Sequence, residues 1–300
     1  MRTQTETKSV ALAEKPPPPP LNLSPLSPGL YVVATPIGNL RDITLRALDV
    51  LAGADLVLAE DTRVTGKLLA AYGLSCKLER YDEHAAERAR PRILAALAEG
   101  RRVALVSDAG TPLISDPGFR LVRAAIELGA AVIPIPGVSA AITALCVAGL
   151  PTDRFLFVGF PPHKTAGRRA MFAQLVSARA TLVFYEGASR LGACLADMAA
   201  VFGSREAVVA RELTKLYETL TRGPLDTLAA DPSLAAPKGE VVVLVAPGIE
   251  TPATEADAQA ALVEALSRVG PAEAASEVAA GLGLPRRDLY RRALALKGVT

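Results

Sequence analysis

Short apolar runs alternate with segments of helical spacing along most of the chain. The apolar runs occupy residues 30–34, 56–59, 103–106 and 131–135. The segments of helical spacing occupy residues 43–52, 85–99, 118–128 and 139–148. Unbroken apolar runs that alternate with helices are typical of a parallel sheet covered on both faces. We therefore expect a first α/β domain over residues 29–150.

The same pattern resumes after the helix-breaking sequence Leu150-Pro151-Thr152-Asp153. The later apolar runs lie near residues 155–159, 181–185, 207–211 and 240–246. We expect them to form a second α/β domain over residues 151–248, again with helices between parallel strands. Residues 258–300 are too few to hold a large core, and they predict a small helical domain.

Residues 1–28 differ from the rest of the chain in composition. They are polar and then proline-rich, with consecutive prolines from Pro16 to Pro20. Consecutive prolines favour polyproline II and cannot continue a helix or a central strand. We predict a disordered extension; a docking peptide for a proline-binding groove is the alternative.

The amino-acid composition limits the class of protein and the cellular compartment that we expect. Apolar residues make up 50% of the chain, enough for two cores, and a formal net charge of +2 is no global sign of a nucleic-acid binder. The three cysteines are far apart and there are only two histidines, which argues against a metal site and favours reduced, buried thiols. There is no apolar leader and no run of about eighteen apolar residues, so we predict a cytoplasmic protein without a membrane segment.

The loops after the expected strands hold the candidate chemistry. The chain has neither the G-x-G-x-x-G dinucleotide motif nor the G-x-x-x-x-G-K-[ST] phosphate loop. The loop at residues 35–40 has a single glycine and contains Pro36, which lacks a backbone donor. Because phosphate cradles depend on free N–H groups, this loop favours a less phosphorylated, partly apolar ligand.

A second loop, Ser107-Asp108-Ala109-Gly110-Thr111-Pro112, follows the third expected strand. The Asp108 carboxylate suits a ribose hydroxyl or an amino group, while Ala109 and Gly110 permit close backbone approach. Ser139 and Ala140 open a small-residue helix after the fourth strand, which suits an N-cap, a packed element or an adenine ring. A second polar turn, Ser115-Asp116-Pro117-Gly118, follows soon after the Asp108 loop, and each of these loops alone is also consistent with a capped turn. At the carboxyl ends of neighbouring parallel strands, they together favour a ligand site.

Basic side chains are concentrated near residue 164 and at the C-terminal end. Lys164, Arg168 and Arg169 open the second domain, and contact with RNA phosphates and a solvated loop are the two interpretations. Arg287 and Arg291 belong to a basic terminal segment, which suits either RNA or the C-terminus of a helix.

Taken in order, the motifs resemble those of the tetrapyrrole methylase superfamily. The matching runs are residues 34–40, 59–63, 104–118, 141–144, 148–151 and 211–215, within about residues 29–246. Among members of that superfamily, the motifs are similar to those of enzymes that methylate the ribose 2′-oxygen of a cytidine in small-subunit (16S) ribosomal RNA. The chain departs from the family pattern at Val138 and at Gly187-Ala188-Ser189.

The resemblance implies two α/β domains of the tetrapyrrole methylase type, with S-adenosyl-L-methionine in the cleft between them, a small helical C-terminal domain and a homodimer. Together with the loops, it gives as cofactor-binding residues Pro36, Asp108, Ala109, Gly110, Ser139, Ala140 and Tyr185. We expect the catalytic residues to be Glu186, as proton acceptor, and Lys164. We expect contacts with substrate RNA from Arg63, Lys164, Arg168, Arg169, Lys215, Arg287 and Arg291.

Two other functions stay open at this point. A methyltransferase for a tetrapyrrole or another small metabolite would share the scaffold. A non-catalytic, RNA-binding ribosome assembly factor would use the same fold without transferring a methyl group. The basic loop and tail favour ribosomal RNA, within the small subunit, as the partner.

Overall fold

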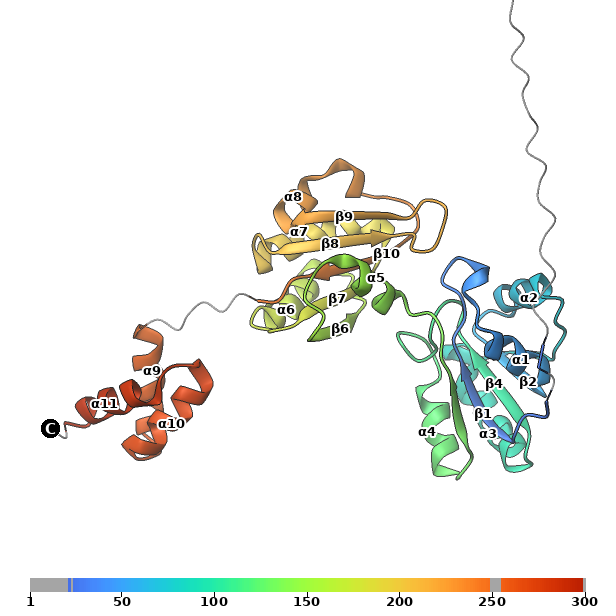
Figure 1. Ribbon diagram of the computed structural model, residues 1–300, viewed down its shortest axis with the longest axis horizontal. Coiled ribbons are helices and arrows are strands. Elements are labelled where there is room, and N and C mark those ends of the chain that lie inside the picture. The colour runs from blue at the N-terminus through green and yellow to red at the C-terminus, as the bar shows by residue number, and fades with distance from the viewer. Residues whose placement is uncertain (1–20, 23, 249–254, 299–300) are drawn as a thin grey trace, which may run out of the picture.

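The computed structural model describes residues 21–22, 24–248 and 255–298, which form two α/β units and a group of three helices (Figure 1). The first sheet is parallel throughout, in the order β3-β2-β4-β1-β5. Its strands are β1 (Gly29–Val33), β2 (Leu56–Ala59), β3 (Leu78–Arg80), β4 (Arg102–Val106) and β5 (Val132–Ile135). The helices that follow these strands are α1 (Leu45–Gly53), α2 (Thr62–Ala71), α3 (Glu83–Ala98), α4 (Phe119–Glu127) and α5 (Ala140–Ala148).

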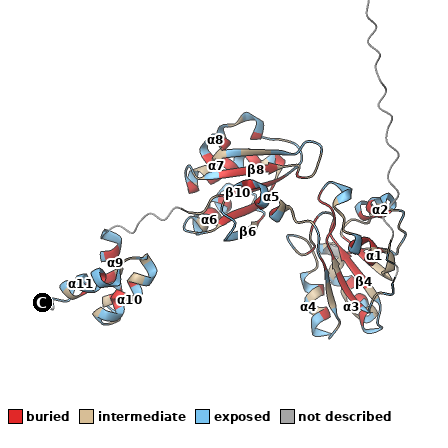
Figure 2. Cartoon of the chain, in the orientation of Figure 1, coloured by how far each residue is buried: buried red, intermediate tan, exposed pale blue. Residues whose placement is uncertain are grey.

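The central strands of this sheet are buried on both faces (Figure 2). Ala104 and Val106 pack with residues of α1 and α2, whereas Val103 and Leu105 pack with residues of α3 and α4. Alternate residues of a strand point to opposite faces, so a strand between two helical layers is apolar at every position. This explains why the unbroken apolar runs correctly predicted the central strands of the first sheet.

Two elements of the first unit were not expected from the sequence. Helix α2 contains Gly66 and buries only Thr65, Leu68 and Leu69, so its apolar face is short. Strand β3 has three residues, two of them charged, at the edge of the sheet. Neither segment is long or apolar enough to produce a recognisable period.

The second sheet is mixed, which corrects our expectation of parallel strands. Its order is β6-β7-β10-β8-β9, and only β6 and β7 run parallel. Its strands are β6 (Phe155–Gly159), β7 (Thr181–Gly187), β8 (Glu206–Arg211), β9 (Thr219–Pro224) and β10 (Glu240–Val245). The helices beside it are α6 (Thr165–Leu175), α7 (Leu191–Phe202) and α8 (Leu225–Ala230). A strand covered on both faces is apolar whatever its direction, so the pattern could not reveal the antiparallel pairs.

Helix α5 packs against the second sheet, although it precedes the boundary we expected at residue 150 (Figure 1). Its residues Ala141, Ala144 and Leu145 are buried with Val242 and Leu244 of β10. Small side chains bring a helix close to a flat sheet. By packing, the division between the two units therefore falls at residues 136–139, and the small-residue helix covers a sheet.

Helices α9 (Glu255–Leu266), α10 (Pro271–Leu282) and α11 (Arg286–Leu296) bury a core of their own, around Leu262 and Leu289. At the other end, residues 1–20 and 23 of the expected disordered extension lie outside the described residues. Its described end is ordered, since Leu26 packs against the α1 side of the first core and Tyr31 donates to Ser27 O at 2.7 Å.

Two further observations concern the described residues. No helix among them is long and apolar enough to cross a membrane. Of the three thiols, Cys194 is buried, Cys76 is half-buried and Cys146 is exposed, so our expectation of buried thiols was wrong for Cys146.

Candidate active site

The carboxyl ends of β1 and β4 are joined by a short network of hydrogen bonds. Thr35 and Gly110 form an antiparallel bridge, with N–H···O distances of 2.8 and 3.0 Å. The Ser107 hydroxyl donates to Gly110 O at 3.1 Å, and the Thr111 hydroxyl donates to Val138 O at 3.0 Å. These bonds fix the loops that follow β1, β4 and β5 against one another.

Gly110 is required at its position in this network. Its φ is +82°, and a Cβ there would lie 3.3 Å from Ile37 Cγ2 and 3.6 Å from Val138 O. L-residues rarely adopt this left-handed conformation. The positive φ and the close contacts with Ile37 and Val138 therefore both favour glycine at this position.

A cavity of about 390 Å³ lies between these loops and the second sheet; we call it the main cavity. Six of the predicted cofactor residues line it, namely Asp108, Ala109, Gly110, Ser139, Ala140 and Tyr185. Pro36 does not line it. It lines an adjoining cavity of about 420 Å³, the side cavity, which shares Ile37, Asp108, Ala109 and Glu240 with the main cavity.

Tyr185 forms the wall that the second sheet contributes. Its ring makes edge contacts with Phe157 and Phe160, with centroids 4.9 and 5.5 Å apart. Its hydroxyl oxygen accepts from the Ala141 N–H at 3.2 Å. Ser139 occupies the N-cap position of α5 but makes no side-chain cap, so Tyr185 from another strand satisfies the helix end. Burial raises the pKa of the Tyr185 phenol.

Carboxylates gather on the opposite wall. The Asp61 N–H donates to Asp108 Oδ1 at 2.9 Å, which ties the end of β2 to the loop after β4. Burial, and then the charge of Glu60, raise the pKa of Asp116 to about 6. Burial, followed by the charges of Asp108 and Asp82, raises the pKa of Glu60. Because each of these carboxylates makes ionisation of its neighbours less favourable, this wall is a region of negative potential.

Our sequence analysis gave no site role to Glu60, Phe160 or Glu240, and it gave Asp116 only as part of a polar turn. All four line the main cavity. Glu60 directly follows β2, and Asp116 lies in the same long loop as Asp108. Their positions after strands were a usable signal. Phe160 and Glu240 could not be recognised in this way, because their position beside the Asp108 loop depends on how the two sheets pack together.

Glu186 does not suit the role of proton acceptor that we predicted. It borders the main cavity, but its side chain has 0% exposure and forms an ion pair with Arg190. It follows Tyr185 on β7, and its partner Val241 belongs to the core beneath α7. Successive strand residues point to opposite faces, so the Glu186 carboxylate faces away from the Tyr185 side. A carboxylate held there cannot reach a hydroxyl in the cavity.

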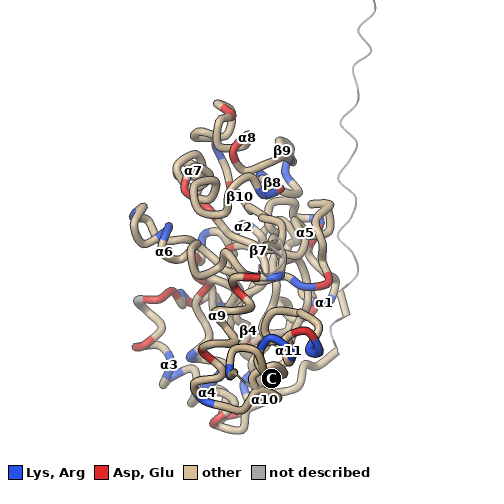
Figure 3. The backbone as a smooth tube through the Cα atoms, turned by 90° about the vertical axis from the view of Figure 1, so that its left-hand side faces the viewer, with Lys and Arg blue, Asp and Glu red and all other residues tan. Residues whose placement is uncertain are grey.

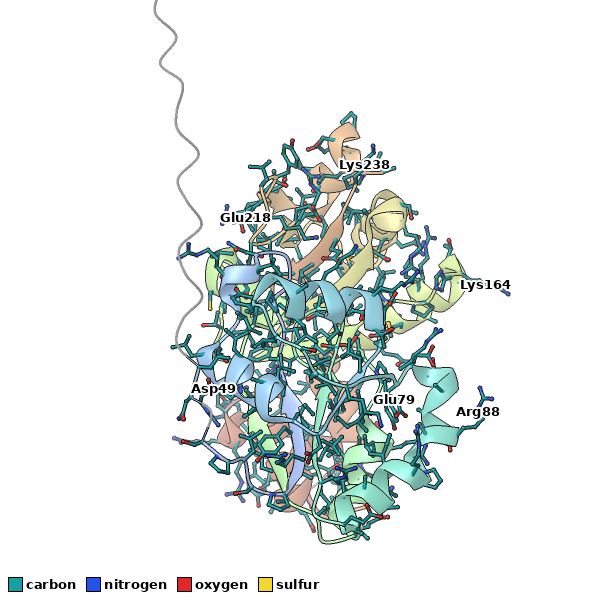
Figure 4. The ribbon with its side chains drawn as sticks, turned by 90° about the vertical axis from the view of Figure 1, so that its right-hand side faces the viewer. Asp49, Glu79, Arg88, Lys164, Glu218 and Lys238 are labelled. Atoms are coloured by element: carbon teal, nitrogen blue, oxygen red, sulfur yellow. The ribbon has the colours of Figure 1, made fainter. Side chains whose placement is uncertain are left out.

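The RNA contact predicted for Arg168 is also wrong, because this side chain is buried with 3% exposure. Its Nε donates to Asp197 Oδ2 at 2.7 Å, and its Nη1 donates to His163 O at 3.2 Å. Arg169 shares Asp197 but is half exposed. Lys164 is exposed and points outward from the start of α6, and it lines none of the described cavities (Figure 4). Its predicted catalytic role has no support in this position.

The side cavity has charged side chains of both signs, Lys67 and Lys215 with Asp108 and Glu240. Lys215 lines it and forms ion pairs with Glu212 and Glu240 at 2.8 and 3.0 Å. Burial by itself would lower the pKa of Lys215. The hydrogen bonds to Glu212 and Glu240 have the larger combined effect, so the pKa of Lys215 is raised. Lys67 also lines this cavity, and our sequence analysis missed it. Arg63 lies one turn earlier on α2, exposed and paired with Asp61.

The predicted RNA residues of the tail lie on α11, where basic side chains recur (Figure 3). The four arginines of this helix are Arg286, Arg287, Arg291 and Arg292. Arg287 is exposed, and Arg291 is exposed with a contact of 3.3 Å to Asp288. Among the described residues there is no group of His, Cys, Asp and Glu side chains that could hold a metal ion.

The residues of the main cavity fit S-adenosyl-L-methionine. The volume lies within the range of small-molecule sites. Small residues, Ala109, Gly110 and Ala140, line it beside the Tyr185 ring, and the acidic wall suits a cation. Lys, Arg and His are absent from the described lining, so a polyphosphate is a poor match.

Solved structures define the class. A uroporphyrin-III-C-methyltransferase from Thermus thermophilus covers 72% of this chain and 93% of its own, with a TM-score of 0.52 and 26% identity. The methyltransferase CobJ covers 73% and 94%, with a TM-score of 0.56 and 20% identity. The fold is that of these methyltransferases. The family of tetrapyrrole (corrin/porphyrin) methylases matches residues 29–229, and the RsmI C-terminal HTH domain matches residues 252–297.

Curated relatives narrow the class further. The ribosomal RNA small subunit methyltransferase I of Mesorhizobium japonicum is 49% identical over 275 residues, covering 91% of this chain and 94% of the relative. The protein of the same name from Erythrobacter litoralis is 53% identical over 273 residues, covering 91% and 97%. The chain belongs to the tetrapyrrole methylases, a family of S-adenosyl-L-methionine-dependent methyltransferases, and within it to the group of these relatives.

Proposed function

We propose that this chain transfers a methyl group from S-adenosyl-L-methionine to the ribose 2′-oxygen of a cytidine in small-subunit (16S) ribosomal RNA. The observation that carries the proposal is the extent of the likeness, which includes both the methylase part and the C-terminal helices. Relatives at about half identity over nine tenths of the chain are named for that RNA. Such a substrate is assembled in the cytoplasm, and we propose that location.

The main cavity would hold the cofactor. Asp108 would accept hydrogen bonds from its hydroxyl or amino groups, and Gly110 would let the backbone approach it. Tyr185 and Phe160 would cover its apolar parts from the second sheet. The bound cofactor supplies an electrophilic methyl carbon on a positively charged sulfur. The protein's task is to align a ribose oxygen with that carbon, which removes the entropy of bringing two reactants together.

The side cavity would receive the nucleotide that is methylated. It adjoins the main cavity through Ile37 and Asp108, so a ribose there would border the cofactor. Lys215 and Lys67 line it, and Arg63 lies beside it on α2. Lys67, and Lys215 and Arg63 if they exchange their carboxylate partners for phosphate, would meet a phosphodiester backbone, whereas Lys, Arg and His are absent from the described lining of the main cavity. The contrast favours RNA over a small metabolite.

More distant contacts would come from Lys164, Arg169, Arg287 and Arg291, which are exposed or half exposed. The logarithm of the binding constant falls with the logarithm of the salt concentration, with a slope of about 0.7 to 0.9 per phosphate contact. Removing one contact should therefore reduce this slope by about that amount. We expect Arg287→Ser/Arg291→Ser to weaken RNA binding and flatten its salt dependence. Arg123→Ser, at an exposed position of α4, is the matched control.

We also propose a homodimer. Edge strand β6 exposes Phe155 and Leu156, which are 45% and 41% accessible, and a second copy would cover them. Light scattering of the full chain should give twice the monomer mass. A monomer at micromolar concentration would contradict this part of the proposal.

The main test is methylation with tritiated S-adenosyl-L-methionine. Naked small-subunit RNA, assembled small subunits and large-subunit RNA are compared as substrates. The proposal requires label in small-subunit RNA, at a cytidine whose 3′ phosphodiester resists alkali. Label in a tetrapyrrole, or cofactor binding without transfer to RNA, would point to the other functions considered from the sequence.

A further inference from the structure

The main cavity has an excess of carboxylates. Its lining includes the carboxylates of Glu60, Asp108, Asp116 and Glu240, and no Lys, Arg or His among the described residues. Glu240 is neutralised by its ion pair with Lys215. The other three have no ion-pair partner within the described part of the chain.

The three unpaired carboxylates lie close enough to influence one another. Asp108 accepts a hydrogen bond from the Asp61 N–H at 2.9 Å. The charges of Glu60 and Asp108 oppose the ionisation of Asp116, whose pKa is raised first by burial. The charges of Asp108 and Asp82 oppose the ionisation of Glu60. A cation placed among these three cavity-lining carboxylates would relieve their mutual repulsion.

We propose that Glu60 and Asp116 make this cavity select the charged sulfonium cofactor over the neutral thioether that remains after methyl transfer, and that cofactor binding releases a proton from this pair. The inference rests on the proposed cofactor. Methyl transfer removes the positive charge from sulfur, so the carboxylates lose their partner and the product is held less tightly. Glu60 and Asp116 thus determine specificity and need not touch the reacting oxygen.

Other charged groups surround the pair. Asp116 and Glu60 also border a third cavity, between α3 and α4, whose titratable or charged residues are Tyr81, Glu83, Glu87, Arg90 and Arg120. Arg90 and Arg120 both form ion pairs with Glu87, which partly neutralises their charges. From the second sheet, Tyr185 is the titratable group that faces Asp116. None of these supplies a free cation to Asp116.

The test is isothermal titration calorimetry of the full chain with S-adenosyl-L-methionine and with S-adenosyl-L-homocysteine, in buffers of different ionisation enthalpy. With a pKa of Asp116 of about 6 in the free protein, about half a proton should be released per bound cofactor at pH 6. Affinity for the cofactor should rise about tenfold from pH 5 to pH 7, because fewer molecules must first lose the proton. Affinity for the thioether should change much less.

Asp116→Asn keeps the shape and removes the charge. It should abolish the proton release and reduce the preference for the cofactor over the thioether about tenfold, while Asp153→Asn, an exposed position outside the cavity, should change neither. Glu60→Gln should have a smaller effect in the same direction. Cofactor binding by the wild-type chain with no proton release and no preference would overturn this inference and leave the proposed function intact. Absence of cofactor binding would overturn both.

Discussion

The buried Arg168–Asp197 pair leads to a quantitative prediction about the loop beside the active site. Asp197 on α7 is 3% exposed and accepts from both Arg168 and Arg169. Arg168 also donates to His163 O at 3.2 Å, in the loop after β6 that contains Phe160. Arg168→Met should therefore destabilise both α7 and that loop.

The expected size follows from what remains after the substitution. Removing one partner of a buried ion pair costs about 3–5 kcal/mol, since the other charge stays buried. Here Arg169 still contacts Asp197, so we expect about 2–3 kcal/mol. Arg169→Met removes a half-exposed partner and should cost about 1 kcal/mol or less. The double variant Arg168→Met/Asp197→Leu removes both buried charges and should recover most of the loss.

Hydrogen exchange with mass spectrometry measures this locally, which suits a chain of several folding units. A loss of about 2 kcal/mol corresponds to amide exchange about thirtyfold faster in peptides from α6 and α7. Peptides from α1 to α4 serve as the internal control. Exchange in Arg168→Met within about threefold of wild type, or equal to that of Arg169→Met, would refute the assignment of Arg168 as the buried partner.

Three further changes have defined outcomes. Tyr185→Phe leaves the Ala141 N–H without its acceptor and should lower cofactor affinity about fivefold, about 1 kcal/mol, by calorimetry; unchanged affinity would contradict the cap. Gly110→Ala places a Cβ at φ +82° and should lower stability by about 1–2 kcal/mol in thermal unfolding, whereas no change would mean the loop relaxes freely. Arg102 holds the pKa of Asp55 at about 2, below its usual 3.8, so the pair stabilises the fold above about pH 4 and less as pH falls through 2. The stability difference between wild type and Asp55→Asn should therefore shrink on acidification, and a constant difference from pH 7 to pH 2 would exclude this pair as its cause.

Much of the first unit could be predicted from the sequence. The strands β1, β2 and β4 are buried between two helical layers, and such strands are mostly apolar. Gly110 and Asp108 could be selected because they follow one of these strands, and the carboxyl ends of parallel strands meet at one edge. These are local properties, fixed by residue type and position along a strand.

The side-chain roles depended on the tertiary structure. Glu186 and Arg168 were selected by charge alone, and charge does not reveal direction. Pairing with β10 sets which face of β7 meets α7, and this turns Glu186 away from the cavity. Asp197, distant in sequence, makes Arg168 a buried residue.

The sequence by itself determined the class of fold, four of the five strands of the first sheet and the loops that line the main cavity, because strand burial and turn residues are local properties. The tertiary structure decided that α5 covers the second sheet, that β10 runs antiparallel to β7, and that Tyr185 meets Ala141 across the site. It also brought Glu60 and Asp116 to one wall of the main cavity. Contacts between distant segments depend on register and packing, which no pattern of neighbouring residues contains.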